Sequence, residues 1–257
     1  MSAQTFSAGV LGCGRWGSFL CWYASRLGAR VIAYEPKGSP ALDELRSSRR
    51  NRYLELPVDV LLTDELERAV GSADMVLAAV PTCELRALSR RLSGLDLSRK
   101  ALLLCMKGVE KETGQRLSQI VSSEGVSPLA TIAWLGPGHP QDFVRSVPGC
   151  MLLVGEDEST VKALSDRLSS DLIRFYRSSD MIGCETGAAA KNVVGIAAGI
   201  LDGLGLSSLK GPLMARAPQE VARLVSALGG DWRSVYGLSH LGDYEATLFS
   251  RHSRNRG

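Results

Sequence analysis

The sequence predicts an α/β protein in which a parallel sheet, covered by helices on both faces, is followed by a second, all-helical domain. Short, continuous apolar runs alternate with longer amphipathic segments up to about residue 183, and from about residue 184 the periodicity is helical throughout. A glycine-rich motif follows the first apolar run. Apolar runs separated by helices are typical of parallel strands buried on both faces. We therefore expect one domain over residues 1–183 and a second over residues 184–257.

The elements can be placed from the period of the hydrophobic residues and from the glycines and prolines that end them. Strands are expected at residues 6–12, 29–35, 74–81, 100–108, 130–138, 149–156 and 172–180. Helices are expected between them at residues 15–28, 64–73, 83–94, 113–125 and 159–170. The second domain is expected to contain helices within 186–205, 217–230 and 239–257.

Composition excludes several classes of protein. The formal net charge is only +3 in 257 residues, so nucleic acid is not an expected partner. No secretory signal and no uncharged run long enough to cross a bilayer are visible, and we expect a cytoplasmic protein without membrane insertion. The six cysteines lack the spacing of a metal or redox motif. They are interpreted as reduced packing residues, and no metal site is expected.

The glycine-rich motif is "GCGRWGS", in which Gly12, Gly14 and Gly17 have the G-x-G-x-x-G spacing. It follows a predicted strand, opens a predicted helix, and is followed by an acid, Glu35, at the end of the next strand. In that setting the glycines permit a tight turn and a close approach of the backbone to a pyrophosphate. The alternative is a glycine-rich turn in another α/β protein. We predict a Rossmann-type domain that binds NAD, because Glu35 would accept both ribose hydroxyls; NADP stays possible.

The second domain opens with "TGAAAKNVVGIAAGILDGLG", residues 186–205, in which Lys191 is the single cation among small apolar residues. Burying an ammonium group is costly, and burial lowers its pKa toward the working range. Such a lysine suits a general acid. The alternative is a lysine whose amine reaches the surface from a packed helix.

Seven segments along the chain resemble NAD(P)-dependent glycerol-3-phosphate dehydrogenases. These are "GCGRWGS" (12–18), "NRYLELP" (51–57), "AAVPT" (78–82), "MKGVEKETGQRLS" (106–118), "GPGHPQDF" (136–143), "ETGAAAKNVVGIAAGILDGLG" (185–205) and "LGDYEATLFSRHSRNRG" (241–257). The last two are the most specific. The resemblance implies reversible hydride transfer between a nicotinamide ring and the central carbon of dihydroxyacetone phosphate, giving sn-glycerol 3-phosphate.

The resemblance also implies roles for individual residues. Lys191, Lys107 and Asp243 correspond to catalytic residues, with Lys191 protonating the carbonyl oxygen and Asp243 holding its ammonium group. The implied cofactor-binding residues are Gly12, Gly14, Arg15, Trp16, Gly17, Glu35, Pro81, Lys107, Pro140 and Arg254. The implied substrate-binding residues are Lys107, Gly136, Lys191, Asn192, Asp243, Thr247 and the phosphate-binding triplet Ser253, Arg254 and Asn255. Lys107 lies at the C-terminal end of a predicted strand, where open α/β sheets bind their ligands, and the alternative is an ordinary surface lysine. Without the resemblance, the triplet would be interpreted as a solvated basic tail.

The chain also departs from the family pattern. Met106 stands where the family usually has Thr, and the segments at 135–143 and 206–217 differ from the usual ones. The family continues with further helices after the triplet, so the second domain looks shortened. We expect the chain either to form a homodimer or to be part of a longer protein. Two alternatives to the implied function stay open: the same chemistry on another small phosphorylated or phosphonylated hydroxyketone, and a catalytically silent NAD(H)-binding redox sensor.

Overall fold

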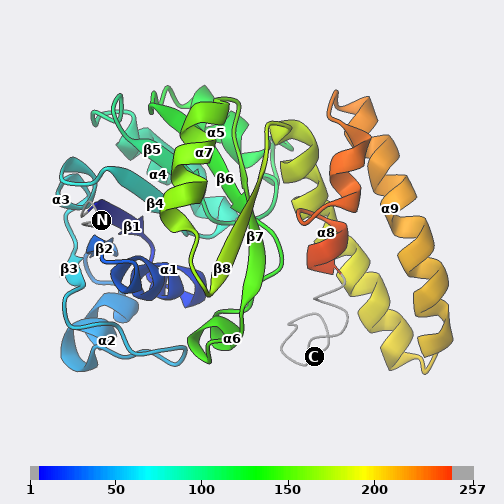
Figure 1. Cartoon of the computed structure of the whole chain (residues 1–257), viewed down its shortest axis with the longest axis horizontal. Helices are drawn as coiled ribbons and strands as arrows, with labels where there is room; N and C mark the ends of the chain where they lie inside the picture. Colours follow the sequence, from blue (N-terminus) through cyan, green and yellow to red (C-terminus); the bar gives the residue numbers. More distant parts are fainter. Residues whose placement is uncertain (1–5, 245–257) are drawn as a thin grey trace.

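The computed structural model describes residues 6–244, which form a central sheet, helices on both of its faces, and a helical part beside it (Figure 1). The sheet has eight strands in the order β3-β2-β1-β4-β5-β6-β7-β8. From β1, inside the sheet, β2 and β3 follow toward one edge, whereas β4 to β8 follow toward the other edge. The point between β1 and β4, where the order reverses, is where open α/β sheets bind their ligands.

The strands are short, and along the chain each one is followed by a helix. The strands are β1 Ser7–Leu11, β2 Arg30–Tyr34, β3 Leu61–Thr63, β4 Met75–Ala78, β5 Ala101–Leu104, β6 Ala130–Leu135, β7 Gly149–Val154 and β8 Ile173–Ser178. The helices of this part are α1 Arg15–Arg26, α2 Pro40–Ser48, α3 Leu66–Gly71, α4 Thr82–Leu92, α5 Leu117–Ser123, α6 Pro140–Val144 and α7 Glu158–Leu168. The helical part contains α8 Met181–Gly203, α9 Lys210–Ala227 and the 3-10 turns η1 Ser207–Leu209 and η2 Trp232–Tyr236.

Alternate residues of the strands supply two hydrophobic layers. On β2, Val31 and Ala33 belong to the layer covered by α1 and α7, whereas Ile32 and Tyr34 belong to the layer covered by α3, α4 and α5. Side chains on successive strand residues point to opposite faces, so a strand buried on both faces has to be apolar throughout. This is why the predicted strands could be recognised as continuous apolar runs, and why the α/β fold class is confirmed.

The sheet is not parallel throughout, which corrects the prediction. β7 pairs with β6 in the antiparallel sense, with Trp134 opposite Leu153, and β8 is parallel to β7. The connection from β6 to β7 contains only α6, a helix of 5 residues. β7 therefore starts at the same end of the sheet at which β6 stops.

The helical part differs from the prediction mainly in where its helices begin. α8 begins at Met181 after Asp180, whose carboxylate accepts the Gly183 N–H and thus caps the helix. α9 begins at Lys210 and includes Pro218, although we expected this helix to begin at residue 217. The helices α2 and α6 and the strand β3 were not expected from the sequence. Within residues 6–244, no helix is long and apolar enough to cross a membrane.

Candidate active site

The glycine-rich loop connects β1 to α1 at the point where the strand order reverses. Gly12 has a φ of +97°, and a Cβ there would lie 2.7 Å from the Ala79 carbonyl oxygen. A Cβ on Gly17 would overlap the Gly12 carbonyl oxygen, whereas one on Gly14 would meet nothing within 4 Å. Gly12 and Gly17 therefore let helix α1 pack on the strands, and Gly14 leaves open space at the helix N-terminus. The first turn of α1 holds no acidic residue, so its N–H groups favour an anion.

Glu35 follows β2 and turns back toward the same loop. Its carboxylate accepts the Cys13 backbone N–H and lies 3.3 Å from the Ser39 hydroxyl. An acid at this position next to the glycine-rich loop has the placement of a ribose-binding group. The neighbouring arginines have other contacts, since Arg46 forms an ion pair with Asp64 at 3.4 Å and Arg49 donates to backbone carbonyls.

Three charged side chains meet between the sheet and the helical part. Lys191 on α8 forms an ion pair with Oδ1 of Asp243 at 2.8 Å, and Lys107, just after β5, forms one with Oδ2 of the same carboxylate. Lys107 also donates to the Gly136 carbonyl oxygen at 3.0 Å. The side chain of Asp243 is 5% exposed, that of Lys191 12% and that of Lys107 24%. One buried carboxylate therefore joins two amines from different parts of the chain.

The surroundings of Lys191 lower the pKa of its amine. Burial lowers the pKa of Lys191, the positive charge of Lys107 lowers it further, and Asp243 opposes both effects; the resulting pKa is about 8. His139, at the start of α6, also lies within electrostatic reach of Lys191 and Asp243. Burial and the positive charge of Arg15 lower the pKa of His139. At neutral pH the site thus combines two ammonium groups, one carboxylate and a neutral imidazole.

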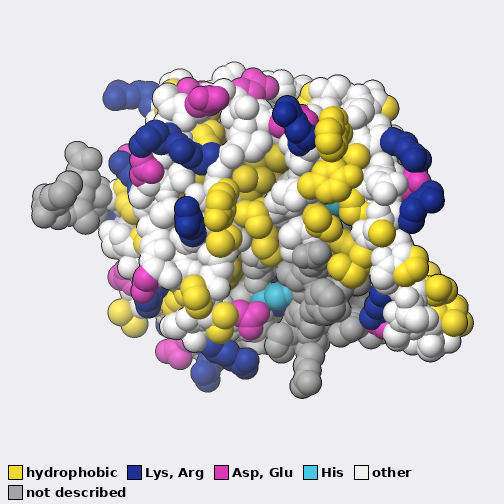
Figure 2. All heavy atoms as spheres, turned by 45° about the vertical axis from the view of Figure 1, so that its right-hand side comes forward, with side chains coloured by type: hydrophobic (Ala, Val, Ile, Leu, Met, Phe, Trp, Pro, Cys, Tyr) yellow, Lys and Arg dark blue, Asp and Glu magenta, His cyan; other side chains and the backbone are white. Residues whose placement is uncertain are grey.

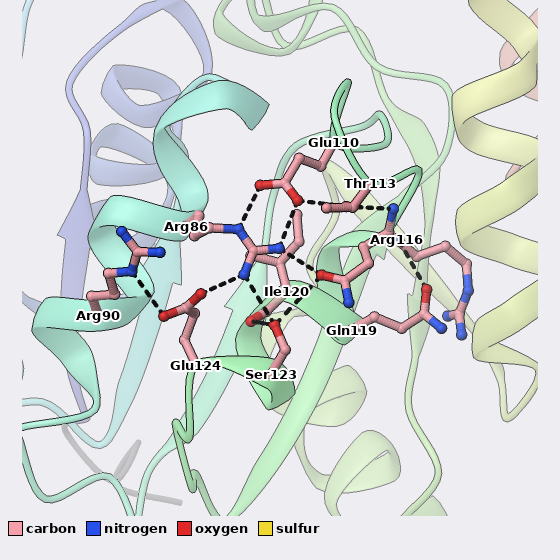
Figure 3. Close-up of polar contacts among 10 residues, drawn as sticks. Arg86, Arg90, Glu110, Thr113, Arg116, Gln119, Ile120, Ser123 and Glu124 are labelled. Carbon is pink, nitrogen blue, oxygen red and sulfur yellow. Dashed lines mark hydrogen bonds and ion pairs between the residues drawn. The ribbon is translucent and has the colours of Figure 1, made fainter.

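A network centred on Arg86 of α4 holds the loop that carries Lys107 (Figure 3). The guanidinium forms a bidentate pair with Glu110 at 2.7 and 2.6 Å, donates to Gln115 at 2.6 Å and pairs with Glu124. The hydrogen bonds from Arg86 and from the Thr113 hydroxyl lower the pKa of the Glu110 carboxyl to about 2. Planar, bidentate pairing restricts geometry as well as adding energy. The loop between β5 and α5 is therefore fixed against α4.

A second set of contacts ties the start of α5 to α8. The Glu185 carboxylate, on α8, accepts from the Arg116 guanidinium at 2.7 Å and from the backbone N–H and hydroxyl of Ser118 at 2.9 and 2.5 Å. The side chain of Glu185 is 2% exposed. Sequence analysis missed this residue, although an acid within the small-residue stretch before Lys191 was a signal of the same kind as the lysine itself. Glu185 joins the sheet part to the helix that carries Lys191.

The other residues implied by the resemblance are spread around this site. Arg15 donates to Gln141 of α6 at 2.6 Å, and Trp16, in the first turn of α1, packs against the core. Pro81 directly precedes α4 in the connection from β4, and the buried Pro140 opens α6. Asn192, next to Lys191 on α8, has an exposed side chain. Thr247, Ser253, Arg254 and Asn255 lie outside the described residues.

His240 is a buried residue to which the sequence analysis assigned no role. Its ring Nδ1 donates to the Gly187 carbonyl oxygen at 2.8 Å, and its side chain is fully buried. The ring also stacks on Tyr244 with centroids 6.1 Å apart. No sequence motif marks this contact, because it joins residues that are 53 positions apart.

Sequence comparisons place these features in a known family. The family model for the N-terminus of NAD-dependent glycerol-3-phosphate dehydrogenase matches residues 7–161, and the model for the C-terminus of the same family matches residues 180–257. A protein of Deinococcus radiodurans named glycerol-3-phosphate dehydrogenase (NAD(P)+) is 38% identical over 253 residues, which cover 96% of this chain and 74% of that protein. The protein of the same name from Pelodictyon phaeoclathratiforme is 34% identical over 255 residues, covering 96% of this chain and 76% of its own length.

Solved structures agree with these matches. The glycerol-3-phosphate dehydrogenase of Coxiella burnetii superposes with a TM-score of 0.91 at 29% identity, covering 98% of this chain and 78% of that one. The Dunaliella salina enzyme, at 17% identity and a TM-score of 0.86, shares the fold and covers 98% of this chain and 47% of its own. Both halves of the sequence and the arrangement of the helical part beside the sheet thus match one family. The chain belongs to the NAD-dependent glycerol-3-phosphate dehydrogenases.

Proposed function

We propose that this protein is an oxidoreductase that interconverts dihydroxyacetone phosphate and sn-glycerol 3-phosphate with a nicotinamide cofactor, NAD in preference to NADP. The observation that carries the proposal is the contact of one buried carboxylate, Asp243, with both Lys191 and Lys107. Relatives that are 31–38% identical over most of this chain are named for this reaction.

The residues of the sheet part fit a dinucleotide. Gly14 leaves space at the N-terminus of α1, whose N–H groups have no acidic neighbour in the first turn. A pyrophosphate would accept from these N–H groups, and the Glu35 carboxylate would accept from the ribose hydroxyls. Arg15, Trp16, Pro81 and Pro140 are proposed to line the remainder of the cofactor site. When bound, the reduced nicotinamide supplies the hydride that is added to the substrate carbonyl carbon.

Lys191 is proposed as the proton donor. As the carbonyl carbon gains a hydride, its oxygen gains negative charge and needs a proton, and an ammonium group with a pKa of about 8 can supply one at neutral pH. In the reverse direction the neutral amine takes the proton from the hydroxyl. Asp243 holds the Lys191 amine in place through the 2.8 Å ion pair. The proton therefore moves between Lys191 Nζ and one oxygen of the substrate.

Lys107 and the residues near it are proposed to position the substrate. With Lys191 protonated, the two lysines and Asp243 have a net charge of +1, which favours a phosphorylated substrate over a neutral one. Gly136 and Asn192 are proposed as further substrate contacts. Thr247, Ser253, Arg254 and Asn255 have the same proposed role on the resemblance alone, because they lie outside the described residues.

We also propose how the chain is organised. The domains would divide near residue 183, close to the start of α8 at Met181. A homodimer is supported by an exposed apolar row on α8, where hydrophobic side chains gather on the surface of the helical part (Figure 2). The row consists of Val193, Ile196, Ile200 and Leu204, which are 56–69% exposed. Monomeric proteins rarely leave such faces uncovered. A cytoplasmic location is proposed on composition.

One assay tests the activity directly. NADH is mixed with the protein and dihydroxyacetone phosphate, and the loss of NADH absorbance is followed over time. The proposal expects turnover that depends on both reactants. Turnover with a phosphonate analogue but not with dihydroxyacetone phosphate would favour the alternative substrate class. Binding of NADH without turnover on either compound would favour the redox-sensor alternative and overturn the proposed enzyme.

A further inference from the structure

The buried imidazole of His240 lies between the two segments that carry Asp243 and Lys191. His240 directly precedes residues 241–244, which are helical and include Asp243. The Tyr244 N–H donates to the His240 carbonyl oxygen at 2.7 Å, closing a turn that contains Asp243. On the other side the imidazole Nδ1 donates to the Gly187 carbonyl oxygen at 2.8 Å. Gly187 is four residues before Lys191, which is one turn of α8.

The fit between these two segments is close. A Cβ on Gly187 would lie 3.0 Å from the Cβ of His240, nearer than side-chain atoms ordinarily approach. His240 and Asp243 are both at most 4% exposed. The absence of a side chain at Gly187 is thus what allows the imidazole to reach a helix carbonyl, and the hydrogen bond fixes the distance between the segments. Asp243 lies about one helical turn after His240, and Lys191 lies about one helical turn after Gly187.

Burial lowers the pKa of His240, so its ring is neutral at pH 7. A neutral imidazole that donates from Nδ1 does not add charge to the site, and its effect on catalysis has to be geometric. Within residues 6–244, the charged and titratable groups that act on Lys191 include Asp243, Lys107 from the loop after β5, His139 from the start of α6, and the neutral His240 itself. Asp243 is the acid among them.

We infer that His240 is a positioning residue, whose hydrogen bond to Gly187 holds Asp243 against Lys191. The inference rests on the proposed function for its catalytic meaning, but the contact itself can be tested without substrate. If the bond is removed, the Asp243 segment can move away from α8, and the attraction that favours the charged form of Lys191 weakens. Lys191 would then lose its proton at a lower pH.

Competitive acetylation measures this directly. The intact protein is treated with a trace of acetic anhydride across a range of pH, and mass spectrometry of its peptides gives the pH at which the Lys191 amine becomes reactive. In His240→Leu, we expect Lys191 to titrate at lower pH than in the wild type. The change can reach roughly one to three pH units, the effect of an opposite charge within about 4–6 Å. His240→Asn places an amide donor near the position of Nδ1 and should restore most of the wild-type value.

Two further variants keep the test independent of folding defects. Gly187→Ala retains the imidazole but pushes it away from α8, and should lower the pH of Lys191 titration in the same direction. Ser239→Ala removes the 3.2 Å hydrogen bond from the neighbouring hydroxyl to the Ser234 carbonyl, and should change the melting temperature without changing that titration. The same titration in wild type, His240→Leu and Gly187→Ala would overturn the inference. Failure of the wild type to oxidise NADH would instead overturn the proposed function, because acetylation needs no substrate.

Discussion

Lys107 and Asp243 form an ion pair across 136 positions of the chain, from the end of a sheet strand to the last described turn of the helical part. The other oxygen of the same carboxylate contacts Lys191. The carboxylate is nearly inaccessible to solvent, so neither contact is screened as a surface pair would be. This shared carboxylate is the element on which the expected behaviour of the active site depends.

Replacing Lys191 by alanine is expected to abolish most of the turnover while leaving cofactor binding intact. Loss of a general acid costs roughly 10²–10⁴ in rate. We expect kcat for dihydroxyacetone phosphate reduction to fall by about that factor. NADH affinity, measured by fluorescence titration, should stay within a factor of about two, because Lys191 is on α8 and is not one of the residues proposed to bind the dinucleotide. Lys210→Ala, which removes an ion pair with Asp202 on the same helical part, serves as the control. Wild-type kcat in Lys191→Ala would assign the proton to another group.

The pH dependence should differ in sign between the two directions. Burial and Lys107 lower the pKa of Lys191 to about 8, and the protonated amine is the proposed acid for reduction. The rate of reduction should therefore be high below about pH 8 and fall above it. The rate of oxidation, which needs the neutral amine, should instead rise as the pH approaches about 8. Profiles of kcat/KM against pH in both directions, which report the pKa values of the free enzyme, test this. Two profiles with the same direction of change near pH 8 would contradict the role of Lys191.

Glu35 is expected to make the protein prefer NADH over NADPH. Its carboxylate would accept from the ribose hydroxyls and repel the extra phosphate of NADPH. The ratio of kcat/KM for the two cofactors measures the preference. In Glu35→Gln the repulsion is lost, and the ratio should fall by roughly tenfold or more, since a charged hydrogen bond contributes about 1.5–3 kcal/mol. A wild-type preference for NADPH would mean that the arginines at 46–52 outweigh the acid.

Glu185 is expected to contribute strongly to stability. Its buried carboxylate accepts three hydrogen bonds from Arg116 and Ser118. Removing one partner of a buried pair costs about 3–5 kcal/mol, because the other charge is left without compensation. We expect Glu185→Ala to lower the free energy of unfolding in urea by about this amount. Lys162→Ala, which breaks a pair that is 62% and 63% exposed, should change it by less than about 1 kcal/mol. Similar effects of the two substitutions on the free energy of unfolding would show that Glu185 does not hold α8 against the start of α5.

Arg254→Ala is expected to weaken substrate binding selectively. The resemblance assigns Arg254 to the substrate phosphate, and a charge-assisted contact of this kind contributes about 1.5–3 kcal/mol. The KM for dihydroxyacetone phosphate should rise by roughly 10- to 150-fold. The dissociation constant for NADH, for which the resemblance also implies a contact of Arg254, should rise by a much smaller factor than this KM. Arg251→Ala removes the same charge from the same segment and serves as the control. Equal KM values in the two variants would favour the alternative interpretation, in which this segment is a solvated basic tail.

The strands could be predicted from the sequence because burial on both faces demands a local signal, namely unbroken apolar residues. β1, β2, β4, β5 and β6 were all recognised in this way. β3 was missed because it has 3 residues and only one of them is buried. The direction of β7 was also missed, because it depends on how the chain turns after β6 and not on the residues of the strand itself.

Within the site, the glycine-rich loop and Lys191 could be found from the sequence, because each departs from its local surroundings. The glycines stand at a spacing that only a tight turn requires, and the lysine interrupts a run of small apolar residues. The contacts of Glu185 and His240 were decided only by the tertiary structure. Each joins residues more than 50 positions apart, at 67–69 positions for Glu185 and 53 for His240. A hydrogen bond between distant segments depends on how the helical part packs against the sheet, and packing is a property of the whole fold that no local pattern carries.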